Sequence, residues 1–205
     1  MNNNYIIRRE TPDDFFVVEN LVRESFWNVY RPGCSEHYVL HCFRSSAAFV
    51  PQLDYVLQTE DGEVVGQVMF ARASVNLDNG GMLPVVTFGP ICILPRLQRK
   101  GLGKFLLDYA LDQAEKLGFG AVCTEGNIDF YGTCGFVAGK NVGIRYADDP
   151  EADYFIVREL KHGYLDGASG TYTDPKEYFV DDADVNEFDK LFPPKQKEVH
   201  KGQLQ

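Results

Sequence analysis

The pattern of apolar and polar positions predicts a strand, a helix and a second strand near the middle of the chain. Val85 to Ile93 is a continuous, β-branched apolar run, as expected of a strand buried on both faces of a sheet. The following apolar positions recur at helical spacing as far as Gly118, a residue type that commonly ends a helix. They are Leu102, Phe105, Leu106, Tyr109, Ala110, Ala114 and Leu117, with Leu107 and Leu111 widening the band. Ala121 to Thr124 is the second strand, so the three elements predict a right-handed parallel crossover.

The residues before this crossover predict that the sheet begins antiparallel. Tyr5 to Arg9 has the pattern of a strand, and the sequence Thr11-Pro12-Asp13-Asp14 predicts the start of a helix that runs to about Phe26. Tyr55 to Ala73 predicts a hairpin about Asp61-Gly62, and Asn79-Gly80-Gly81 predicts a further turn. The remaining expected elements are a helix at Ser35 to about Phe43, a helical segment near Ile128 to Cys134, and strands near Val137 and at Tyr154 to Leu160.

The length and ends of the chain predict one domain. A chain of 205 residues buries a substantial core, and we expect one domain over residues 1–194 followed by a polar, frayed tail over residues 195–205. The chain start has no apolar segment of signal-peptide length, and Val85 to Pro95 is too short to cross a bilayer. The expectation is a soluble, cytoplasmic protein without a membrane partner. Its five cysteines are then expected to be reduced, mostly structural thiols.

The charge narrows the classes of partner. A formal net charge of −10 argues against nucleic acid, because phosphate backbones are bound by basic surfaces. Four bases nevertheless gather at Arg96, Arg99, Lys100 and Lys104, where they surround two glycines and open the central helix. The first turn of a helix presents unpaired N–H groups, and glycines let the backbone approach an anion. The segment Gln98 to Lys104 therefore suits a pyrophosphate, although an ordinary strand-to-helix turn remains an alternative.

Two other phosphate motifs are excluded at this turn. A Walker A loop needs glycine at position 98 and Ser or Thr at position 105, where Gln98 and Phe105 stand. A dinucleotide fingerprint needs a small residue at position 106, which is Leu106.

The segment from Gly89 to Gly103 resembles the sequence motif of a known family. Its sequence, Gly-Pro-Ile-Cys-Ile-Leu-Pro-Arg-Leu-Gln-Arg-Lys-Gly-Leu-Gly, resembles the coenzyme signature Gln/Arg-x-x-Gly-x-Gly/Ala of the GNAT superfamily. The resemblance implies the GNAT (acyl-CoA N-acyltransferase) fold, an α/β fold with a mixed central sheet flanked by helices, and acetyl-CoA as cosubstrate. It implies that Ile91 and Ile93 offer backbone groups to the pantetheine arm. It places the pyrophosphate on Gln98, Arg99, Lys100, Gly101, Leu102, Gly103 and Lys104.

A second motif follows at the distance that this family has. Tyr131-Gly132-Thr133-Cys134-Gly135-Phe136 resembles the family's Tyr-x-x-x-Gly-Phe. The residues around it, with the later Leu165 to Gly170, are most similar to the bacterial YhbS-like branch. The resemblance to the family core covers roughly residues 60 to 140.

The resemblance also implies roles in the chemistry. Tyr131 is expected near the coenzyme sulfur as a proton donor to the leaving thiolate, since a phenol has comparable basicity; packing against Phe130 and Phe136 is its alternative role. A backbone N–H near Cys92 or Ile93 is the simplest oxyanion donor. The buried strand has no carboxylate, so the base is not evident. Glu125 and Asp129 are candidates, with helix-cap or surface roles favoured for both; Asn127 suits either a coenzyme contact or a turn.

Other residue clusters give weaker predictions about function. The residues Cys34, His37, His41 and Cys42 match no standard zinc spacing, so no metal is expected. This region suits an acceptor wall with Trp27, Tyr30 and Tyr38, although such aromatics are also typical of a core. Cys134 has no local histidine to activate it as a nucleophile. The acidic residues between positions 174 and 189 suit either attraction of a cationic acceptor or a solubilising surface, and the solubilising surface is favoured.

The sequence therefore predicts an N-acetyltransferase that moves an acetyl group from acetyl-CoA to a primary amine of a small-molecule or peptide acceptor, by direct attack on the thioester. Two alternatives stay open, a noncatalytic acyl-CoA-binding regulatory module and an interaction protein that uses the fold as a scaffold. A homodimer is compatible with the sequence, which does not fix the oligomeric state.

Overall fold

The computed structural model describes residues 4–203, which fall into two compact units. The first unit comprises the described residues up to Met69, Pro90–Leu106, and those from Lys176 onward. The second unit comprises Phe70–Gly89 and Leu107–Pro175. Three of the four boundaries between the units lie inside two long strands and one helix, so these three elements contribute residues to both units.

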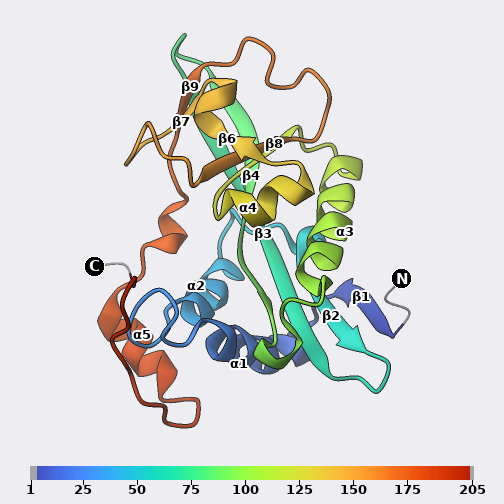
Figure 1. Cartoon of the computed structure of the whole chain (residues 1–205), viewed down its shortest axis with the longest axis vertical. Helices are drawn as coiled ribbons and strands as arrows, with labels where there is room; N and C mark the ends of the chain where they lie inside the picture. The colour runs from blue at the N-terminus through green and yellow to red at the C-terminus, as the bar shows by residue number, and fades with distance from the viewer. Residues whose placement is uncertain (1–3, 204–205) are drawn as a thin grey trace. The chain divides into compact units, whose positions relative to one another are not determined.

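The sheet of the first unit begins antiparallel, as predicted (Figure 1). Its strands are β1 (Tyr5–Arg9), β2 (Tyr55–Thr59) and the first half of β3 (Val64–Leu77). β1 pairs with β2, and β2 with β3, with a bulge between Leu57 and Gln58. The end of β4 (Met82–Ile93) lies beside β3, because the Leu94 N–H donates to the Val65 carbonyl at 2.8 Å.

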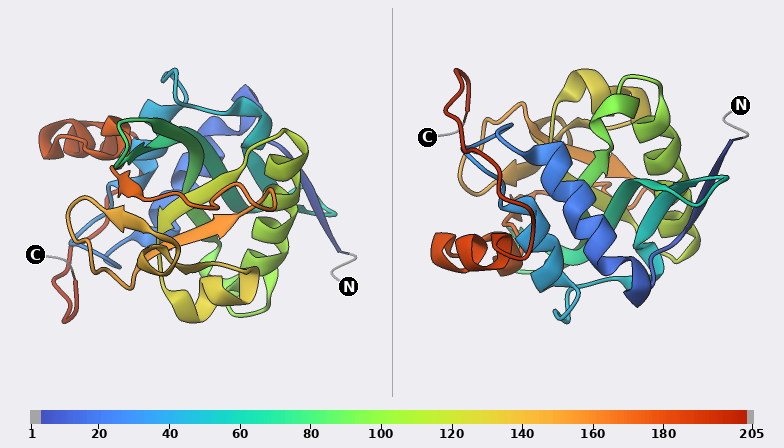
Figure 2. Two further views of the ribbon diagram at one scale, coloured as in Figure 1. Left: turned by 90° about the horizontal axis from the view of Figure 1, so that it is seen from above. Right: turned by 90° about the horizontal axis from the view of Figure 1, so that it is seen from below.

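Three α-helices belong to the first unit: α1 (Phe15–Phe26), α2 (Glu36–Phe43) and α5 (Asp182–Asp189). α1 and α2 pack against each other (Figure 2). The predicted helix start is confirmed: the Thr11 amide donates to Asp14 Oδ2 at 2.9 Å, in the 3-10 turn that leads into α1. The 3-10 turns of this unit are Pro12–Asp14, Pro51–Leu53, Pro95–Leu97 and Lys176–Tyr178.

The C-terminal segment is held by α1, which corrects two sequence-based interpretations. Arg23 is fully buried and donates from Nε to Asp189 Oδ1 at 2.6 Å, so the acidic stretch is not only a solubilising surface. The tail predicted to be frayed is hydrogen-bonded as far as residue 203. Lys195 pairs with Glu24 at 2.8 Å, and the Trp27 indole donates to the Gln196 carbonyl at 2.9 Å. A polar tail is ordered here because α1 supplies matching partners.

A buried ionic network also joins elements of the first unit. Arg44, at the end of α2, donates to Glu10 at 2.6 Å and to Glu19 of α1 at 2.5 Å. Buried charges persist where each has a partner of opposite sign, so this network fixes α2 against α1 and the end of β1.

The second unit contains the remaining strands. β3 and β4 are joined by the turn predicted at Asn79-Gly80-Gly81, where the Gly80 N–H donates to the Leu77 carbonyl at 2.9 Å. β4 pairs in parallel with β5 (Ala121–Glu125), which pairs antiparallel with β8 (Phe155–Glu159), and β8 pairs with β6 (Val137–Ala138). Two strands that the sequence did not predict, β7 (Ile144–Tyr146) and β9 (Gly170–Tyr172), pair in parallel, and β9 also pairs with β3.

The predicted crossover helix is α3 (Leu102–Lys116), and it ends as expected. Gly118 has φ 89°, and the Phe119 N–H donates back to the Ala114 carbonyl at 3.1 Å. Leu106, Leu107, Ala110, Leu111 and Ala114 are fully buried. Phe105 and Tyr109 are 37% exposed, so the buried stripe is centred on the Leu106–Leu107 side rather than on the whole predicted band.

Short helical segments complete the second unit: α4 (Ile128–Tyr131) and the 3-10 turns Gly132–Cys134 and Gly139–Val142. Its core packs Val75, Val85, Cys123 and Val157 around the rings of Phe155 and Tyr172. All five cysteines are free thiols, as predicted. Between residues 4 and 203, no helix has the length and apolar character needed to cross a membrane.

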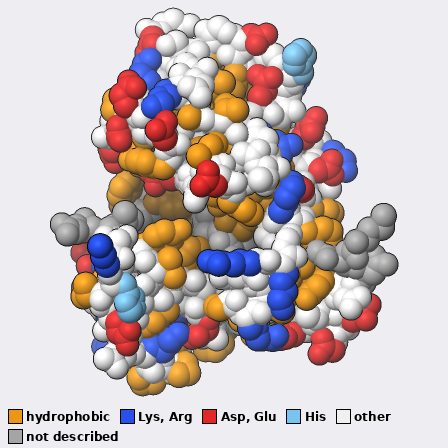
Figure 3. Space-filling view, in the orientation of Figure 1, with side chains coloured by type: hydrophobic (Ala, Val, Ile, Leu, Met, Phe, Trp, Pro, Cys, Tyr) orange, Lys and Arg blue, Asp and Glu red, His pale blue; other side chains and the backbone are white. Residues whose placement is uncertain are grey.

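Acidic and basic side chains are interspersed with hydrophobic ones on the face that Figure 3 shows. The net charge of −10 is therefore not gathered on that face as one acidic patch.

Candidate active site

The turn between β4 and α3 has the backbone that its sequence predicts. The Gln98 side chain donates from Nε2 to the Ile93 carbonyl at 3.0 Å, which closes the turn back onto the end of the strand. Arg99 has φ 59° and Gly101 has φ 81°. A Cβ at Gly101 would meet no atom within 4 Å, so this glycine is required by its backbone conformation rather than by lack of space.

This turn leads directly into the first turn of α3. The Phe105 N–H donates to the Gly101 carbonyl at 3.0 Å, and the amides just before it lie in the helix turn that has no intrahelical acceptor. Arg99 and Lys100 are exposed. Arg96 differs from them because it pairs with Glu63, which raises the pKa of Arg96. The turn thus combines helix-end amides with at least two solvent-facing cations, as an anion site requires.

At the end of β4, successive residues direct their backbone N–H and C=O groups alternately toward β3 and away from it. The Leu94 N–H is directed to β3, and the Cys92 carbonyl also lies on that side, 3.2 Å from the position that a Cβ on Gly66 would take. Strand alternation therefore directs the N–H groups of Ile91 and Ile93 away from β3. Cys92 is 6% exposed, and burial raises the pKa of its thiol to about 12, so this thiol is a packing group.

Tyr131 ends α4 in the second unit and is half-buried. Its ring lies 5.7 Å from Phe88, 5.7 Å from Phe136 and 4.9 Å from Phe130, measured between ring centroids. A Cβ on Gly126 would lie 2.2 Å from this ring, so only glycine permits the contact. The packing alternative raised by the sequence is thus realised, and it fixes the ring without excluding a role for the hydroxyl.

Asn127 caps α4, since its side-chain oxygen accepts from the Asp129 N–H at 2.8 Å. The turn role weighed for Asn127 is therefore observed. Asp129 is exposed, and its amide rather than its carboxylate is used in this cap.

Glu125 stands at the end of β5, opposite Phe155 of β8. Desolvation raises the pKa of Glu125, and so do the charges of Asp174 and Asp148, while a hydrogen bond with Tyr146 lowers it. Tyr146 donates to Asp174 Oδ2 at 2.6 Å. Tyr146 was not predicted from the sequence, because its strand has only three residues and no motif, and Asp174 was interpreted as part of the solubilising stretch.

The two histidines of the cluster that was weighed for zinc pack against an aromatic ring. The rings of His37 and His41 both lie against Phe188, with centroid distances of 5.4 and 4.6 Å, so these two side chains share one face of α2. His37 is fully buried, and burial lowers its pKa to about 4. Within residues 4–203, no three His, Cys, Asp or Glu side chains are grouped to hold a metal ion.

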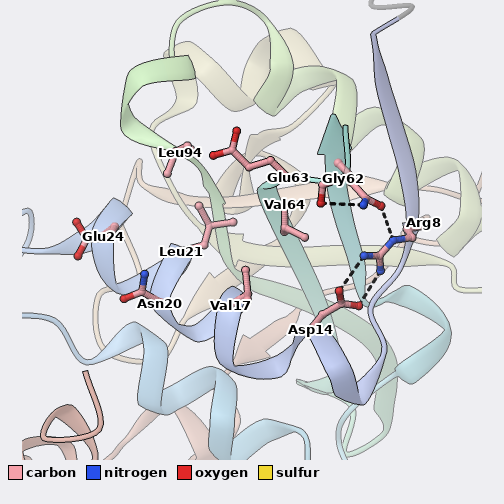
Figure 4. Close-up of a pocket in the computed structure, with 11 residues that line it drawn as sticks. Arg8, Asp14, Val17, Asn20, Leu21, Glu24, Gly62, Glu63, Val64 and Leu94 are labelled. Atoms are coloured by element: carbon pink, nitrogen blue, oxygen red, sulfur yellow. Dashed lines mark hydrogen bonds and ion pairs between the residues drawn. The ribbon is translucent and has the colours of Figure 1, made fainter. Parts of the chain in front are cut away.

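A cavity of about 480 Å³ lies in the first unit, next to α1 (Figure 4). It is lined by Arg8, Asp14, Val17, Asn20, Leu21, Glu24, Gln58, Gly62, Glu63, Val64 and Leu94. Arg8 and Asp14 are paired with each other at 2.7 Å. None of the predicted site residues lines this cavity.

The predicted site residues are divided between the units. The strand end and turn, from Ile91 to Lys104, belong to the first unit. Glu125, Asn127 and Tyr131 belong to the second, where Gly126 brings Tyr131 next to the backbone that carries the other two.

Comparison with known proteins gives one family. A family model described as "Acetyltransferase (GNAT) family" matches residues 19–136. "Uncharacterized N-acetyltransferase YhbS" of Escherichia coli (strain K12) is 27% identical over 165 residues, which is 80% of this chain and 93% of the relative.

Solved structures give the same fold. The crystal structure of the E. coli GNAT family N-acetyltransferase YhbS in complex with CoA has a TM-score of 0.75 and 26% identity, covering 85% of this chain and 92% of the other. A GNAT family acetyltransferase from Brucella melitensis, solved in complex with acetyl-CoA, has a TM-score of 0.68 and 20% identity, covering 87% and 100%. The predicted fold, a mixed sheet flanked by helices, and the resemblance to the YhbS branch are confirmed.

Proposed function

Because this chain belongs to the acetyltransferase (GNAT) family and is thereby an acetyl-CoA-dependent N-acetyltransferase, we propose that it acetylates a primary amine by direct attack of the amine on the thioester. The acceptor is a small molecule or a peptide. The observation that carries the proposal is the turn at Gln98–Gly103, whose backbone and cations suit the pyrophosphate of the coenzyme. YhbS, its relative from E. coli, has been solved in complex with CoA, which supports the same cosubstrate here.

The coenzyme assignment follows from the turn and the strand end. The amides of Gly101, Leu102 and Gly103 would hold the pyrophosphate, with Arg99 and Lys100 adding charge. Ile91 and Ile93 would bind the pantetheine arm through backbone groups directed away from β3. Because the Cys92 carbonyl lies on the β3 side, we assign the oxyanion donor to the Ile93 N–H.

The remaining roles complete the reaction. The neutral amine nitrogen attacks the carbonyl carbon, a C–N bond forms, and the C–S bond breaks with its electron pair leaving on sulfur. Tyr131 donates a proton to that thiolate, and Glu125 accepts the proton that the amine loses. Asn127 keeps its observed role as a helix cap, which holds α4 and therefore Tyr131.

The organisation of the protein remains a prediction. We propose that residues 1–194 act as one GNAT domain and that the protein works in the cytoplasm, where acetyl-CoA is available.

The experiment that tests the function combines binding with turnover. Calorimetric titration with acetyl-CoA and with desulfo-CoA measures coenzyme affinity, and thiol release across a panel of amines measures transfer. We expect saturable binding and thiol release that depends on the amine. Binding with no release from any amine class would favour the noncatalytic module, and absence of binding would refute the coenzyme site.

A substitution at Gly101 tests the assignment of the coenzyme turn. Gly101→Glu should weaken acetyl-CoA binding at least about tenfold, since it strains a backbone at φ 81° and sets a carboxylate against the phosphates. Gly118→Glu is the matched control, because Gly118 has φ 89° with open space beside it, at the other end of α3. If both variants lose equal affinity, the loss reflects helix stability and the pyrophosphate assignment is wrong.

A further inference from the structure

A threonine side chain links two strands of the second unit. β4 and β5 run parallel, with Val86 opposite Val122. Two residues further along both strands, the Thr124 hydroxyl donates to the Phe88 carbonyl at 3.1 Å. Both residues are buried, so water does not compete for this hydrogen bond. Strand carbonyls commonly accept from amides of the neighbouring strand, and here a side chain adds a link of its own.

The Phe88 ring supports the Tyr131 ring from β4. The centroids of these two rings are 5.7 Å apart. The Phe136 ring completes a triangle with them, at 5.9 Å from Phe88 and 5.7 Å from Tyr131. The Phe136 N–H also donates to the Tyr131 carbonyl at 3.2 Å. The Tyr131 ring is therefore packed against a ring that follows it in the chain and against a ring of β4.

Gly126 supports the Tyr131 ring from the end of β5. A Cβ at Gly126 would lie 2.2 Å from this ring, so the ring rests directly on the glycine backbone. The Gly126 N–H donates to the Tyr154 carbonyl at 2.8 Å, and Thr124 pairs in register with Ile156 of β8. Because β8 holds this stretch of backbone, the Thr124 hydroxyl fixes the position of Phe88 relative to Gly126.

We propose that Thr124 is a positioning residue, which holds Phe88 and Gly126 at the separation that orients the Tyr131 phenol for proton donation. The inference rests on the proposed function. In the step that it serves, the Tyr131 O–H bond breaks, an S–H bond forms on the departing thiolate, and the phenolate regains a proton from solvent. Thr124 keeps its own proton, because its hydroxyl donates that proton to the Phe88 carbonyl.

Removing this hydroxyl should affect turnover more than coenzyme binding. Thr124→Val keeps a branched side chain of similar shape and removes the donor, so the Phe88 carbonyl loses a buried hydrogen bond. β4 can then shift relative to Gly126, and a displacement of about 1 Å at a catalytic group is enough to slow a reaction severely. The link uses none of the residues assigned to the pyrophosphate, so acetyl-CoA affinity should be kept.

The test compares Thr124→Val with Thr124→Ser, which retains the hydroxyl. We expect kcat to fall at least about tenfold in Thr124→Val and to stay within about threefold of wild type in Thr124→Ser. The dissociation constant of acetyl-CoA should change less than about twofold in both. Thiol release with one amine and calorimetry measure these quantities. Thr124→Cys, which has a weaker donor, should give an intermediate kcat, and it replaces Thr124→Val if circular dichroism shows that valine prevents folding.

A double-mutant cycle shows whether Thr124 acts through Tyr131. In the Tyr131→Phe background the donated proton is already absent, so Thr124→Val should lower kcat by less than about a further twofold. The full tenfold loss in that background would overturn the proposal. The ¹³C ring signals of Tyr131, assigned with Tyr131→Phe, report the ring without turnover. They should shift or broaden in Thr124→Val and stay near their wild-type positions in Thr124→Ser.

Thr171→Val is the matched control. Thr171 also lies on a strand of the second unit, and its hydroxyl oxygen accepts from Arg145 Nη2 at 3.4 Å. This variant should leave kcat and the Tyr131 ring signals unchanged. The proposal is wrong if Thr171→Val or Thr124→Ser loses as much turnover as Thr124→Val, or if the ring signals do not move in Thr124→Val.

Failure of the function itself would look different. A wild-type protein that releases no thiol with any amine would refute the proposed function, and full turnover in Tyr131→Phe would refute the proton donor. Thiol release that depends on the Tyr131 hydroxyl, with kcat unchanged in Thr124→Val, would refute the role of Thr124 alone.

Discussion

At the scale of single residues, two glycines near the predicted site are required for different physical reasons. Gly101 adopts a left-handed backbone in open space, whereas Gly126 has no room for a Cβ beside the Tyr131 ring. A sequence motif shows glycine at both positions and does not distinguish these two reasons. The distinction matters for mutagenesis, because a substitution at Gly101 acts through backbone strain and charge, and one at Gly126 displaces an aromatic ring.

Tyr131→Phe separates the hydroxyl from the packing of the ring. The variant keeps the contacts with Phe88, Phe130 and Phe136, so we expect acetyl-CoA affinity to be nearly unchanged. Turnover should fall roughly 100-fold, the size expected for loss of a general acid. Steady-state kinetics and calorimetry measure the two quantities. A parallel loss of affinity and turnover would point to a structural role.

At the scale of elements, α5 and the segment after it form the least expected part of the fold. Asp189 of α5 accepts from the buried Arg23, whose guanidinium also stacks on the Trp27 ring at 4.2 Å. His37 of α2 completes the contact, with its Nε2 3.3 Å from Asp189 Oδ1. A stretch that looks like acidic surface in the sequence is therefore a structural element of the first unit.

Acid should destabilise this contact through His37. Burial lowers the pKa of His37 from 6.5 to about 4, although Asp189 opposes the shift and Arg23 and Lys197 add to it. The unfolded chain then binds more protons than the folded one between these values, so stability is lost as pH falls from about 6.5 towards 4. We expect a loss of roughly 2 kcal/mol between pH 7 and pH 5 from this group.

Chemical denaturation at the two pH values measures the effect. His37→Gln should reduce the difference between them, because it removes the titrating group. His162→Gln is the matched control, since the His162 side chain is fully exposed and should leave the difference intact. An unchanged pH dependence in His37→Gln would show that other groups cause the acid sensitivity.

At the scale of the whole molecule, three elements run through both compact units. Three of the four boundaries fall inside these elements: between Met69 and Phe70 in β3, between Gly89 and Pro90 in β4, and between Leu106 and Leu107 in α3. Neither unit can lose these elements without breaking main-chain hydrogen bonds of the other. We therefore expect the two units to unfold together.

Two optical probes test this cooperativity. Trp27 is the only tryptophan of the chain and lies in the first unit, so its fluorescence reports that unit. Far-ultraviolet circular dichroism reports both. Denaturant curves from the two probes should coincide with one midpoint. Separate midpoints would show that the units unfold independently.

The sequence by itself determined the features that depend on neighbouring residues. The start of α1 at Thr11, the glycine turn before α3 and the end of α3 at Gly118 follow from residues within a few positions of one another. The family motifs are equally local, which is why the fold and the coenzyme class were predictable. The three-residue strands β7 and β9 were not, because three residues are too few for a period to emerge.

Only the tertiary structure decided contacts between distant residues. Tyr146 and Asp174 are 28 positions apart, and Arg23 and Asp189 are 166 positions apart. Acids such as Asp174 and Asp189 have the same side chain whether they face solvent or a buried partner. The difference is set by the packing of strands and helices around them, and for that reason it is absent from any local pattern in the sequence.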